Sequence, residues 1–357
     1  MTDLKQYGYE ESETPPVGQI PARVTAQHRD HYSAICRYGE VRASLKGSFI
    51  RSAVTRNDLP CVGDFVLLRH NESGPSLIEG VLPRRTKFSR SDFFGHGLAH
   101  VKANREQLVA ANFDIVFIMM SLNQNFNVNR ASRYLAQTWQ SGAQPVVLLT
   151  KADLVEDAGP HLAAVMEAAP GVPAHAISSH TRSSLDVLDG YLHPGKTAVF
   201  LGMSGVGKSS LLNTLVGWDT MAVKAIREDD SRGRHTTTHR QLVMLPSGAM
   251  IIDTPGMREL GLLGSDDGVS AGFADVEELF VLCRFTNCAH RTEPGCAVLA
   301  ALANGSLQSD RWERYLAHKQ EIRYVEDKAG HIADRNAFFK SISAANRQNK
   351  KDKRFEE

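Results

Sequence analysis

The segment GMSGVGKSS has the residue types and the spacing that bind a polyphosphate. It lies between the apolar run TAVFL, which we expect to be a strand, and SSLLNTLVG, which we expect to be a helix. Glycines let backbone N–H groups point inward at phosphate oxygens, and the helix adds the positive end of its dipole. The flanking elements favour this interpretation over an inert glycine-rich turn. We expect nucleotide contacts from Gly202, Met203, Ser204, Gly205, Val206, Gly207, Lys208, Ser209 and Ser210.

Three side chains would bind the end of the triphosphate and a magnesium ion. Lys208 can reach the β- and γ-phosphates, and the Ser209 hydroxyl can ligate Mg²⁺. Asp253 begins DTPG directly after the expected strand AMIID, where a second carboxylate would hold the water shell of the metal. In the same motif, the N–H of Gly256 would meet the γ-phosphate. The sequence therefore predicts Mg²⁺ bound together with the nucleotide.

The segment TKAD, after the apolar run PVVLL, resembles the guanine-reading motif of GTPases, Asn/Thr-Lys-x-Asp. Asp153 would accept hydrogen bonds from N1 and N2 of guanine, which adenine cannot donate, and the stem of Lys151 would cover the face of the base. Thr150 begins the motif, and Ser178 with Ser179 lies where a loop behind the base is expected. A lone Lys-x-Asp after a strand is mostly structural, so the combination carries the prediction.

The motifs occur in an unusual order along the chain. The guanine motif and base loop come first, followed by the phosphate loop and DTPG. A parallel sheet tolerates such a circular permutation, because its elements keep their places when the termini move. One consequence is that DTPG runs directly toward the C-terminal part of the chain.

A polar segment between the phosphate loop and DTPG, SRGRHTTTH, suits a mobile switch that closes on the γ-phosphate. We expect Thr237 to complete the magnesium shell, with Thr236 and Thr238 as alternatives. The predicted catalytic residues are Lys208, Thr237 and His235.

The assignment of His235 rests on the residue that follows DTPG. Many small GTPases place a glutamine there to orient the attacking water, whereas this chain has Met257, which cannot do so. His235 could position water or accept a proton near neutral pH, and His239 is the second candidate. A histidine on the surface with no catalytic role is the alternative.

Three of the five cysteines lie within fourteen residues and form the pattern C-x4-C-x-H-x5-C. Three thiolates and one imidazole make a closed tetrahedral shell for one structural zinc ion, with no open position for catalysis. Reduced cysteines in a small core are the alternative. The predicted zinc ligands are Cys283, Cys288, His290 and Cys296.

These motifs require a multidomain chain. Residues 1–16 are polar, and we expect them to be a disordered arm. Five short strand patterns at 17–83 predict a β-barrel of the oligonucleotide-binding (OB) fold that binds RNA, with an SH3-like barrel as the alternative. A basic linker is expected at 84–105. Alternating strand and helix patterns at 106–280 predict an α/β P-loop GTPase domain with permuted motif order, and 281–357 predict a mainly α zinc-binding domain with a basic tail.

The net charge of +1 hides an uneven distribution. Lys340 to Arg354 contain six Lys or Arg residues and one Asp, which is either a solvated tail or a contact to RNA phosphate. No apolar run is long enough to span a bilayer, so we expect a cytoplasmic monomer with no membrane partner. Further basic residues expected to face RNA are Arg84, Arg85, Arg90, Arg284, Arg291, Arg311, Arg314 and Lys319.

Taken together, the permuted order, GMSGVGKSS, GRHTTTH, DTPG and the preceding barrel resemble the family of ribosome small-subunit-dependent GTPase A (RsgA, also called YjeQ), from about Val17 to the basic tail. The resemblance implies a bacterial GTPase that binds the small ribosomal subunit and its rRNA late in assembly, is stimulated by it and leaves after hydrolysis. The cysteine spacing also matches the zinc element of that family. Thr150 departs from the asparagine of many members, so we expect weaker nucleotide binding with unchanged choice of guanine.

Two other functions remain open at this stage. One is a nucleotide-gated switch that binds a protein partner and hydrolyses GTP only incidentally. The other is a P-loop kinase or ATPase, which TKAD disfavours. The barrel, the cysteine cluster and the basic tail favour an RNA-dependent GTPase that acts as a checkpoint in small-subunit maturation.

Overall fold

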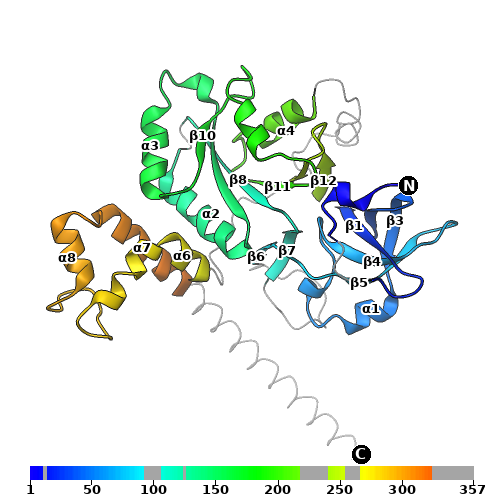
Figure 1. Ribbon diagram of the computed structural model, residues 1–357, viewed down its shortest axis with the longest axis horizontal. Helices are drawn as coiled ribbons and strands as arrows, with labels where there is room; N and C mark the ends of the chain where they lie inside the picture. Colours follow the sequence, from blue (N-terminus) through cyan, green and yellow to red (C-terminus); the bar gives the residue numbers. More distant parts are fainter. Residues whose placement is uncertain (11–13, 92–105, 124–125, 218–239, 254–265, 324–357) are drawn as a thin grey trace, which may run out of the picture. The chain divides into compact units, whose positions relative to one another are not determined.

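The computed structural model describes residues 1–10, 14–91, 106–123, 126–217, 240–253 and 266–323 (Figure 1). Its chain divides into two compact units, Met1–Leu260 and Gly261–Glu357, which we describe one at a time. Among the described residues, none of the helices combines the length and the apolar character needed to cross a membrane.

The first unit begins with a closed five-stranded barrel, which confirms the predicted barrel. Strand β1 pairs with both β2 and β4, and β3 pairs with β5, so the ring runs β1-β2-β3-β5-β4. Alternate side chains of the strands fill its interior, among them Val24, Val66 and Ile78, which are fully buried. A short helix, α1 (Gly47–Ser52), follows β3. The strands are β1 (Ile20–Gln27), β2 (Tyr32–Cys36), β3 (Gly39–Leu45), β4 (Phe65–Arg69) and β5 (Ser76–Val81).

A parallel sheet of five strands forms the centre of the first unit, in the order β10-β9-β8-β11-β13. Its apolar runs are buried on both faces, as is typical of a parallel sheet between helices. This confirms the predicted α/β domain. The strands are β8 (Ile115–Ser121), β9 (Gln144–Thr150), β10 (Ala174–Ala176), β11 (Thr197–Leu201) and β13 (Met250–Asp253).

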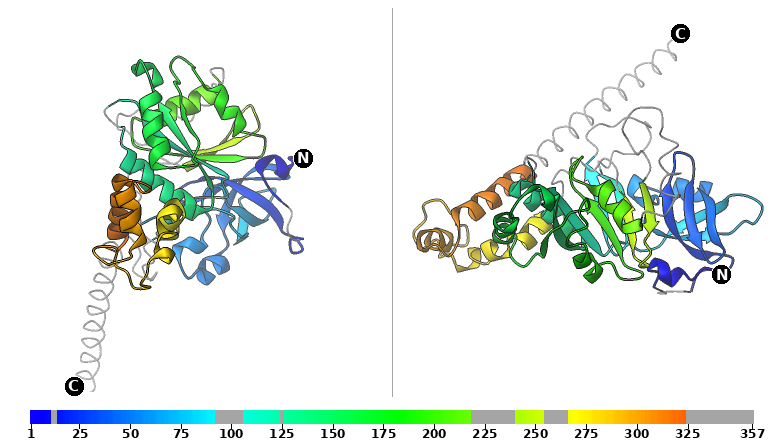
Figure 2. Two further views of the ribbon diagram at one scale, coloured as in Figure 1. Left: turned by 60° about the vertical axis from the view of Figure 1, so that its left-hand side comes forward. Right: turned by 90° about the horizontal axis from the view of Figure 1, so that it is seen from above.

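Helices cover both faces of this sheet (Figures 1 and 2). Side chains of α2 (Val128–Ser141) and α3 (Gly159–Ala168) pack on one face, against Val116 and Ile118 of β8. Side chains of α4 (Lys208–Val216) pack on the other face, against Phe117. Adjacent β8 residues therefore enter different cores, as the two-residue period of a strand requires.

Three strand pairings fall where the sequence predicts none. Strand β12 (Arg240–Met244) pairs antiparallel with β13 on one side and with β1 of the barrel on the other, so barrel and central sheet share one hydrogen-bonded ladder. Strands β6 (Lys87–Ser91) and β7 (Glu106–Ala111) form an antiparallel hairpin, so part of the predicted linker at 84–105 is a strand.

The first ten residues also differ from the expected disordered arm. They form a 3-10 helix, η1 (Leu4–Tyr7), capped by Asp3, whose carboxylate accepts a hydrogen bond from the N–H of Lys5. Leu4 and Tyr9 are buried in a small core with Ile35 and Phe65 of the barrel. The polar composition of this segment conceals its apolar side chains, and their burial compensates for the entropy of ordering the backbone.

Other 3-10 helices lie in the connections of the first unit. One of them, η4, occupies part of a segment that has a helical pattern in the sequence. The remaining 3-10 helices of this unit are η2 (Arg56–Asp58), η3 (Ala152–Leu154) and η4 (Asp186–Gly190).

The second unit is helical in its described part, as predicted. A helix at 309–323 packs on α7, where Arg311 forms two hydrogen bonds with Asp275. Because α6 and α7 belong to this unit, it starts before the boundary at 280 that the sequence predicts. Its labelled elements are α6 (Asp266–Gly272), α7 (Ala274–Glu277), η5 (Phe280–Leu282) and α8 (Ala297–Asn304).

Candidate nucleotide and metal sites

The predicted nucleotide residues in the described part of the chain gather at one edge of the central sheet. Strands β9, β10, β11 and β13 are parallel neighbours or near neighbours, so their carboxyl ends share this edge. Thr150 ends β9, Ser178 follows β10, the phosphate loop follows β11, and Asp253 ends β13. Ligands of open α/β sheets bind outside the carboxyl ends of the strands.

The phosphate loop has the backbone that its glycines permit. Gly205 and Gly207 have φ of 76° and 106°, in the region that residues with a Cβ rarely enter. At Gly202, a Cβ would lie 2.6 Å from the carbonyl oxygen of Met119 on β8, so only glycine fits. Gly207 is also the N-cap of α4, so the loop leads directly to the positive end of that helix.

Lys208 lies in the first turn of α4 and folds back over the loop. Its ammonium group donates to the carbonyl oxygens of Gly202 and of Met203, the latter at 2.8 Å. Ser204 and Ser209 are exposed beside it. A lysine held over the loop in this way is close to where phosphate oxygens would lie, and its hydrogen bonds keep the extended side chain in place.

Thr150 ties the predicted guanine motif to the phosphate loop. Its buried hydroxyl lies 2.6 Å from the carbonyl oxygen of Val206 and 3.2 Å from that of Met120 at the end of β8. The hydroxyl can donate only one hydrogen bond, and the shorter distance assigns that bond to the carbonyl of Val206 in the phosphate loop. This hydrogen bond ties the first residue of the predicted guanine motif to the backbone of the phosphate loop.

Asp153 and Ser178 form the part of the site where guanine is expected. The Ser178 hydroxyl donates to the Asp153 carboxylate and accepts from the N–H groups of His180 and Thr181, both at 3.2 Å. The hydrogen bond from Ser178 holds the pKa of Asp153 below its ordinary value. Asp153 is exposed, so its ionised carboxylate can still accept bonds from a ligand.

Backbone strain is concentrated in the same place. Lys151, Arg182 and Ser184 have φ of 60°, 58° and 55°, which residues with side chains seldom adopt. Strained conformations of this kind are found mainly where a ligand site requires them. Ser179, next to the buried Ser178, is half-buried in this loop.

Ser209 and Asp253 fit a magnesium ion by their chemistry. Ser209 presents its hydroxyl from the first turn of α4, and Asp253 its carboxylate from the end of the neighbouring β13, and Mg²⁺ prefers oxygen ligands. The predicted roles of His235, Thr237 and Gly256, and the alternatives Thr236, Thr238 and His239, lie outside the described residues.

The three cysteines and the histidine come together in the second unit as the sequence predicts. All four candidate ligand atoms lie within 4.8 Å of one another. Sγ of Cys283 is 3.6 Å from Nδ1 of His290 and 4.0 Å from Sγ of Cys296. A tetrahedral zinc shell places ligand atoms about 3.5–3.8 Å apart, given bonds of about 2.0–2.3 Å. The cluster therefore fits one metal ion and is too open for a disulfide.

Neighbouring groups orient these ligands. The backbone N–H of Ala297, at the start of α8, donates to Sγ of Cys283 at 3.4 Å. The His290 ring stacks on Phe280 with centroids 4.3 Å apart, and His290 has a φ of 57°. Such supporting contacts fix the direction of a metal ligand before the ion arrives.

Two of the arginines expected to face RNA are engaged inside the protein. Arg84 forms a two-pronged ion pair with Asp64 at 2.7 and 2.8 Å, and its side chain is 16% exposed. Arg311 is bound to Asp275 in the second unit and is 9% exposed. These two predictions were wrong, because a basic residue in the sequence does not show whether a carboxylate lies beside it. Arg85 is more exposed, at 43%, and pairs with Glu10.

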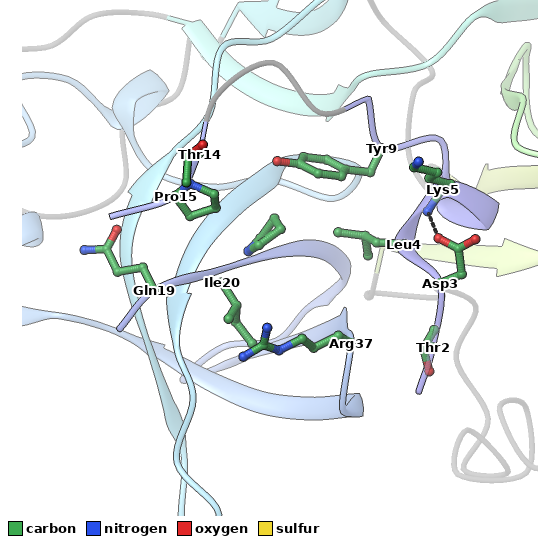
Figure 3. A pocket seen from close by; sticks show the side chains of 11 residues that line it. Thr2, Asp3, Leu4, Lys5, Tyr9, Thr14, Pro15, Gln19, Ile20 and Arg37 are labelled. Carbon is green, nitrogen blue, oxygen red and sulfur yellow. Dashed lines mark hydrogen bonds between the residues drawn. The ribbon is translucent and has the colours of Figure 1, made fainter. Parts of the chain in front are cut away.

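A separate pocket of about 670 Å³ lies between the N-terminal segment and the barrel (Figure 3). Lys5 and Arg37 bring positive charge to it, and Leu4 and Ile20 supply apolar surface. It shares no residue with the predicted nucleotide site, and the sequence contains no motif that points to it. Its full lining is Thr2, Asp3, Leu4, Lys5, Tyr9, Thr14, Pro15, Gln19, Ile20, Pro21 and Arg37.

The comparison with known proteins gives one consistent result. The sequence profile of the RsgA GTPase family matches residues 81–263. The chain is 45% identical over 326 residues to small ribosomal subunit biogenesis GTPase RsgA 2 of Listeria monocytogenes serotype 4b, covering 90% of each protein. It is 43% identical over 320 residues to small ribosomal subunit biogenesis GTPase RsgA of Xanthomonas euvesicatoria, covering 89% of this chain and 85% of that protein.

Solved structures show the same fold. The crystal structure of YjeQ from Thermotoga maritima has a TM-score of 0.62 and 24% identity, covering 85% of this chain and 98% of that chain. The crystal structure of YloQ, a circularly permuted GTPase, has a TM-score of 0.60 and 24% identity, covering 85% and 95%. The permuted GTPase fold predicted from the motif order is therefore confirmed.

Proposed function

The chain belongs to the RsgA GTPase family and is a GTP hydrolase, and on this premise we propose that it binds the small ribosomal subunit and hydrolyses GTP during the maturation of that subunit. The curated relatives that match nine-tenths of the chain are named for small-subunit biogenesis. The observation that carries the proposal most directly is the nucleotide site joined to a barrel through one continuous ladder of strands.

Guanine selection is assigned to Asp153, with Lys151 covering the base and Ser178 and Ser179 behind it. The hydrogen bond from Ser178 to the Asp153 carboxylate supports this assignment, because it favours the ionised form of the carboxylate and fixes its orientation. Thr150 positions the phosphate loop rather than contacting the base. The loop from Gly202 to Ser210 holds the phosphates.

Hydrolysis is assigned to residues around the γ-phosphate. Mg²⁺ neutralises charge on the β- and γ-phosphates when it is bound. Ser209, Thr237 and Asp253 would hold the ion, Lys208 would bind the phosphates, and the Gly256 N–H would meet the γ-phosphate. His235 would position the attacking water, since Met257 offers no hydrogen-bonding group equivalent to glutamine.

The metal of the cysteine cluster is proposed to be zinc. Three thiolates and an imidazole nitrogen are the donor set that zinc favours in closed structural sites. With its four positions filled by the protein, the ion would hold η5 and the start of α8 together and take no part in hydrolysis.

RNA contacts are proposed for the barrel and for the basic residues that remain accessible. In the second unit these include Arg291, which is exposed. RNA contacts are also proposed for the tail from Lys340 to Arg354, on the basis of its basic sequence. We also propose that the protein is a cytoplasmic monomer. Since the RNA phosphate backbone attracts positive charge, binding to the subunit should weaken as salt is raised.

Multiple-turnover GTP hydrolysis, measured with and without purified small ribosomal subunits, tests the proposed function. We expect slow turnover by the protein alone and at least tenfold faster turnover with subunits. Co-sedimentation with subunits should also require a GTP analogue or GTP. Fast hydrolysis by the protein alone, together with no binding to subunits, would contradict the proposal and favour a switch for a protein partner.

A further inference from the structure

Arg23 is buried at the point where three parts of the first unit meet, and it is 1% exposed. Its guanidinium group donates to the carbonyl oxygens of Tyr7 at 2.5 Å, Asn112 at 2.7 Å and Gly63 at 3.3 Å. Tyr7 belongs to the N-terminal segment, Gly63 to the barrel, and Asn112 to the connection between β7 and β8. The group also lies over the ring of Phe65, 4.9 Å from its centre.

This arginine has no carboxylate in an ion pair with it in the described part of the chain. Burial lowers its pKa to about 9, and Asp114 and Asp64 are the acidic groups that oppose this effect from a distance. A buried cation is costly unless hydrogen bonds satisfy it. Separating the barrel from the central sheet would remove some of its carbonyl partners at once, so the arrangement is expected to hold as a unit.

Other contacts bring the same two parts close together. Ala26 and Gln27 of β1 pair with Gln241 and Arg240 of β12. The N–H of Ala111 donates to the carbonyl of a barrel residue, Val62, at 3.1 Å.

Gly63 and Asn112 make the closest approach at this junction. Gly63 has a φ of 92°, and a Cβ there would be 2.1 Å from the carbonyl oxygen of Ala111. Nδ2 of Asn112 donates to the Gly63 carbonyl at 3.2 Å, and Oδ1 of Asn112 accepts from the N–H of Arg85 at 2.9 Å.

Two chain segments lead from this junction to the phosphate site. Strand β12 directly follows the predicted switch segment and pairs with β13, which ends at Asp253. Asp114, two residues after Asn112, accepts from the N–H of Thr197 at 2.9 Å and from the Lys196 ammonium group at 3.1 Å. These residues stand at the start of β11, which ends at the phosphate loop.

We propose that Arg23 is a positioning residue through which occupancy of the barrel controls the rate of GTP hydrolysis. It ties β1 to the N-terminal segment, to the β7–β8 connection and, through Sδ of Met250 at 3.4 Å, to β13. A partner bound to the barrel would therefore restrain the strands that carry the phosphate-binding segments. Arg23 forms no hydrogen bond with any residue assigned to the nucleotide or to a metal ion in the described part of the chain. The inference rests on the proposed function, because it needs a partner that stimulates hydrolysis.

The test compares Arg23→Met with the wild type in basal hydrolysis, in hydrolysis with saturating small subunits, and in GDP affinity. Methionine keeps much of the side-chain length and removes the hydrogen bonds to Tyr7, Gly63, Asn112 and Met250. We expect basal turnover and GDP affinity within about twofold of wild type, and a stimulation ratio lowered at least tenfold at full subunit occupancy, verified by co-sedimentation. Ile78→Val, in the barrel core away from the junction, is the control and should keep the wild-type ratio.

A second variant, Asn112→Gly, tests the same junction in case Arg23→Met does not fold. Asn112→Gly keeps the backbone carbonyl that Arg23 contacts and suits the φ of 53°, but it removes the side-chain bridge to Gly63 and Arg85. Its stimulation ratio should fall at least threefold.

The possible failures are distinguishable. If Arg23→Met unfolds cooperatively on heating and is stimulated by small subunits as strongly as the wild type, the inference is overturned. If Arg23→Met does not fold, a wild-type stimulation ratio in Asn112→Gly overturns the inference instead. If the wild type itself is not stimulated, all ratios will be near one, and the proposed function fails together with the inference.

Discussion

The hydroxyl of Thr150 is the contact on which the shape of the phosphate loop depends most directly. It is buried and bonded to the carbonyl of Val206, which has no other hydrogen-bond donor among the residues that the structure describes. An unsatisfied buried acceptor costs about 1–3 kcal/mol. Threonine at this position therefore fixes the loop without reaching the base.

Thr150→Val tests this role, because valine has nearly the same shape and no hydroxyl. We predict weaker GDP binding, by about 5- to 100-fold if most of the lost 1–3 kcal/mol appears in affinity. Isothermal titration calorimetry measures the change. Thr150→Ser keeps the hydroxyl and should stay within about threefold of wild type. Equal affinities in the valine and serine variants would show that the hydrogen bond is not needed.

The bond from Ser178 to Asp153 predicts a change in pH dependence. It lowers the pKa of Asp153, so the ionised form persists to lower pH than for an ordinary aspartate, whose pKa is about 3.9. Binding that needs this carboxylate is present above the pKa and is lost as pH falls through it. In Ser178→Ala the pKa rises toward the ordinary value, so the affinity for GDP should begin to fall at a higher pH than in the wild type.

Fluorescent GDP titrations from pH 7 to pH 4 would follow this loss, with circular dichroism at each pH to confirm that the protein stays folded. Ser183→Ala is the control, because Ser183 lies in the same loop without bonding to Asp153. Identical pH profiles in wild type and Ser178→Ala would contradict the assigned cause of the shift.

At the scale of elements, the parallel strands were predictable because each is an apolar run buried on both faces. β12 was not, since RQLVM is only partly buried and its pairing with β1 depends on a strand some 200 residues earlier in the chain. The β6–β7 hairpin was missed because neither KFSRS nor EQLVAA alternates regularly between polar and apolar residues. Arg23 likewise gives only a weak signal, because a single charged residue in a strand such as IPARVTAQ does not show that its side chain is buried.

The metal cluster was predictable to the residue, because ligand spacing is local in the sequence. We predict that Cys288→Ser loses the bound zinc, about one ion per chain in the wild type, and much of the helical structure of the second unit. Metal binding supplies much of the folding free energy of such small sites, about 10 kcal/mol or more in isolated zinc-finger peptides. Elemental analysis and circular dichroism measure both changes.

The control for this variant is Cys36→Ala in the barrel, which should keep its zinc. GDP affinity should also remain within about twofold of wild type in Cys288→Ser, because the nucleotide site lies in the first unit. Full zinc content in Cys288→Ser would show that this thiolate is not a ligand.

At the scale of the whole molecule, the N-terminal segment closes the first unit across the barrel and the central sheet. Leu4 is buried beside Phe65 of the barrel. Tyr7 packs against this small core on one side and against the core of the central sheet on the other. A Cβ at Gly8 would lie 2.7 Å from the carbonyl oxygen of Gly195, just before β11. Composition alone could not reveal this role, because the surface that receives these side chains is assembled from distant strands.

Leu4→Ala is predicted to destabilise the first unit by about 2 kcal/mol, at the low end for a buried leucine because its core is small. Urea denaturation followed by GDP-dependent fluorescence would measure the loss. Lys5→Ala, at an exposed position of the same helix, should change stability by less than about 0.5 kcal/mol. Equal effects of the two substitutions would mean that the segment is not packed.

The permuted order of motifs leads to one guanine-selective site at the carboxyl edge of the sheet, and calorimetry of GDP and ADP tests this most directly. The wild type should bind GDP at least 100-fold more tightly than ADP, and Asp153→Ala should lose most of that preference, since the base would lose its acceptor. Glu156→Ala, an exposed carboxylate nearby, should keep it. An undiminished preference for GDP in Asp153→Ala would contradict the account.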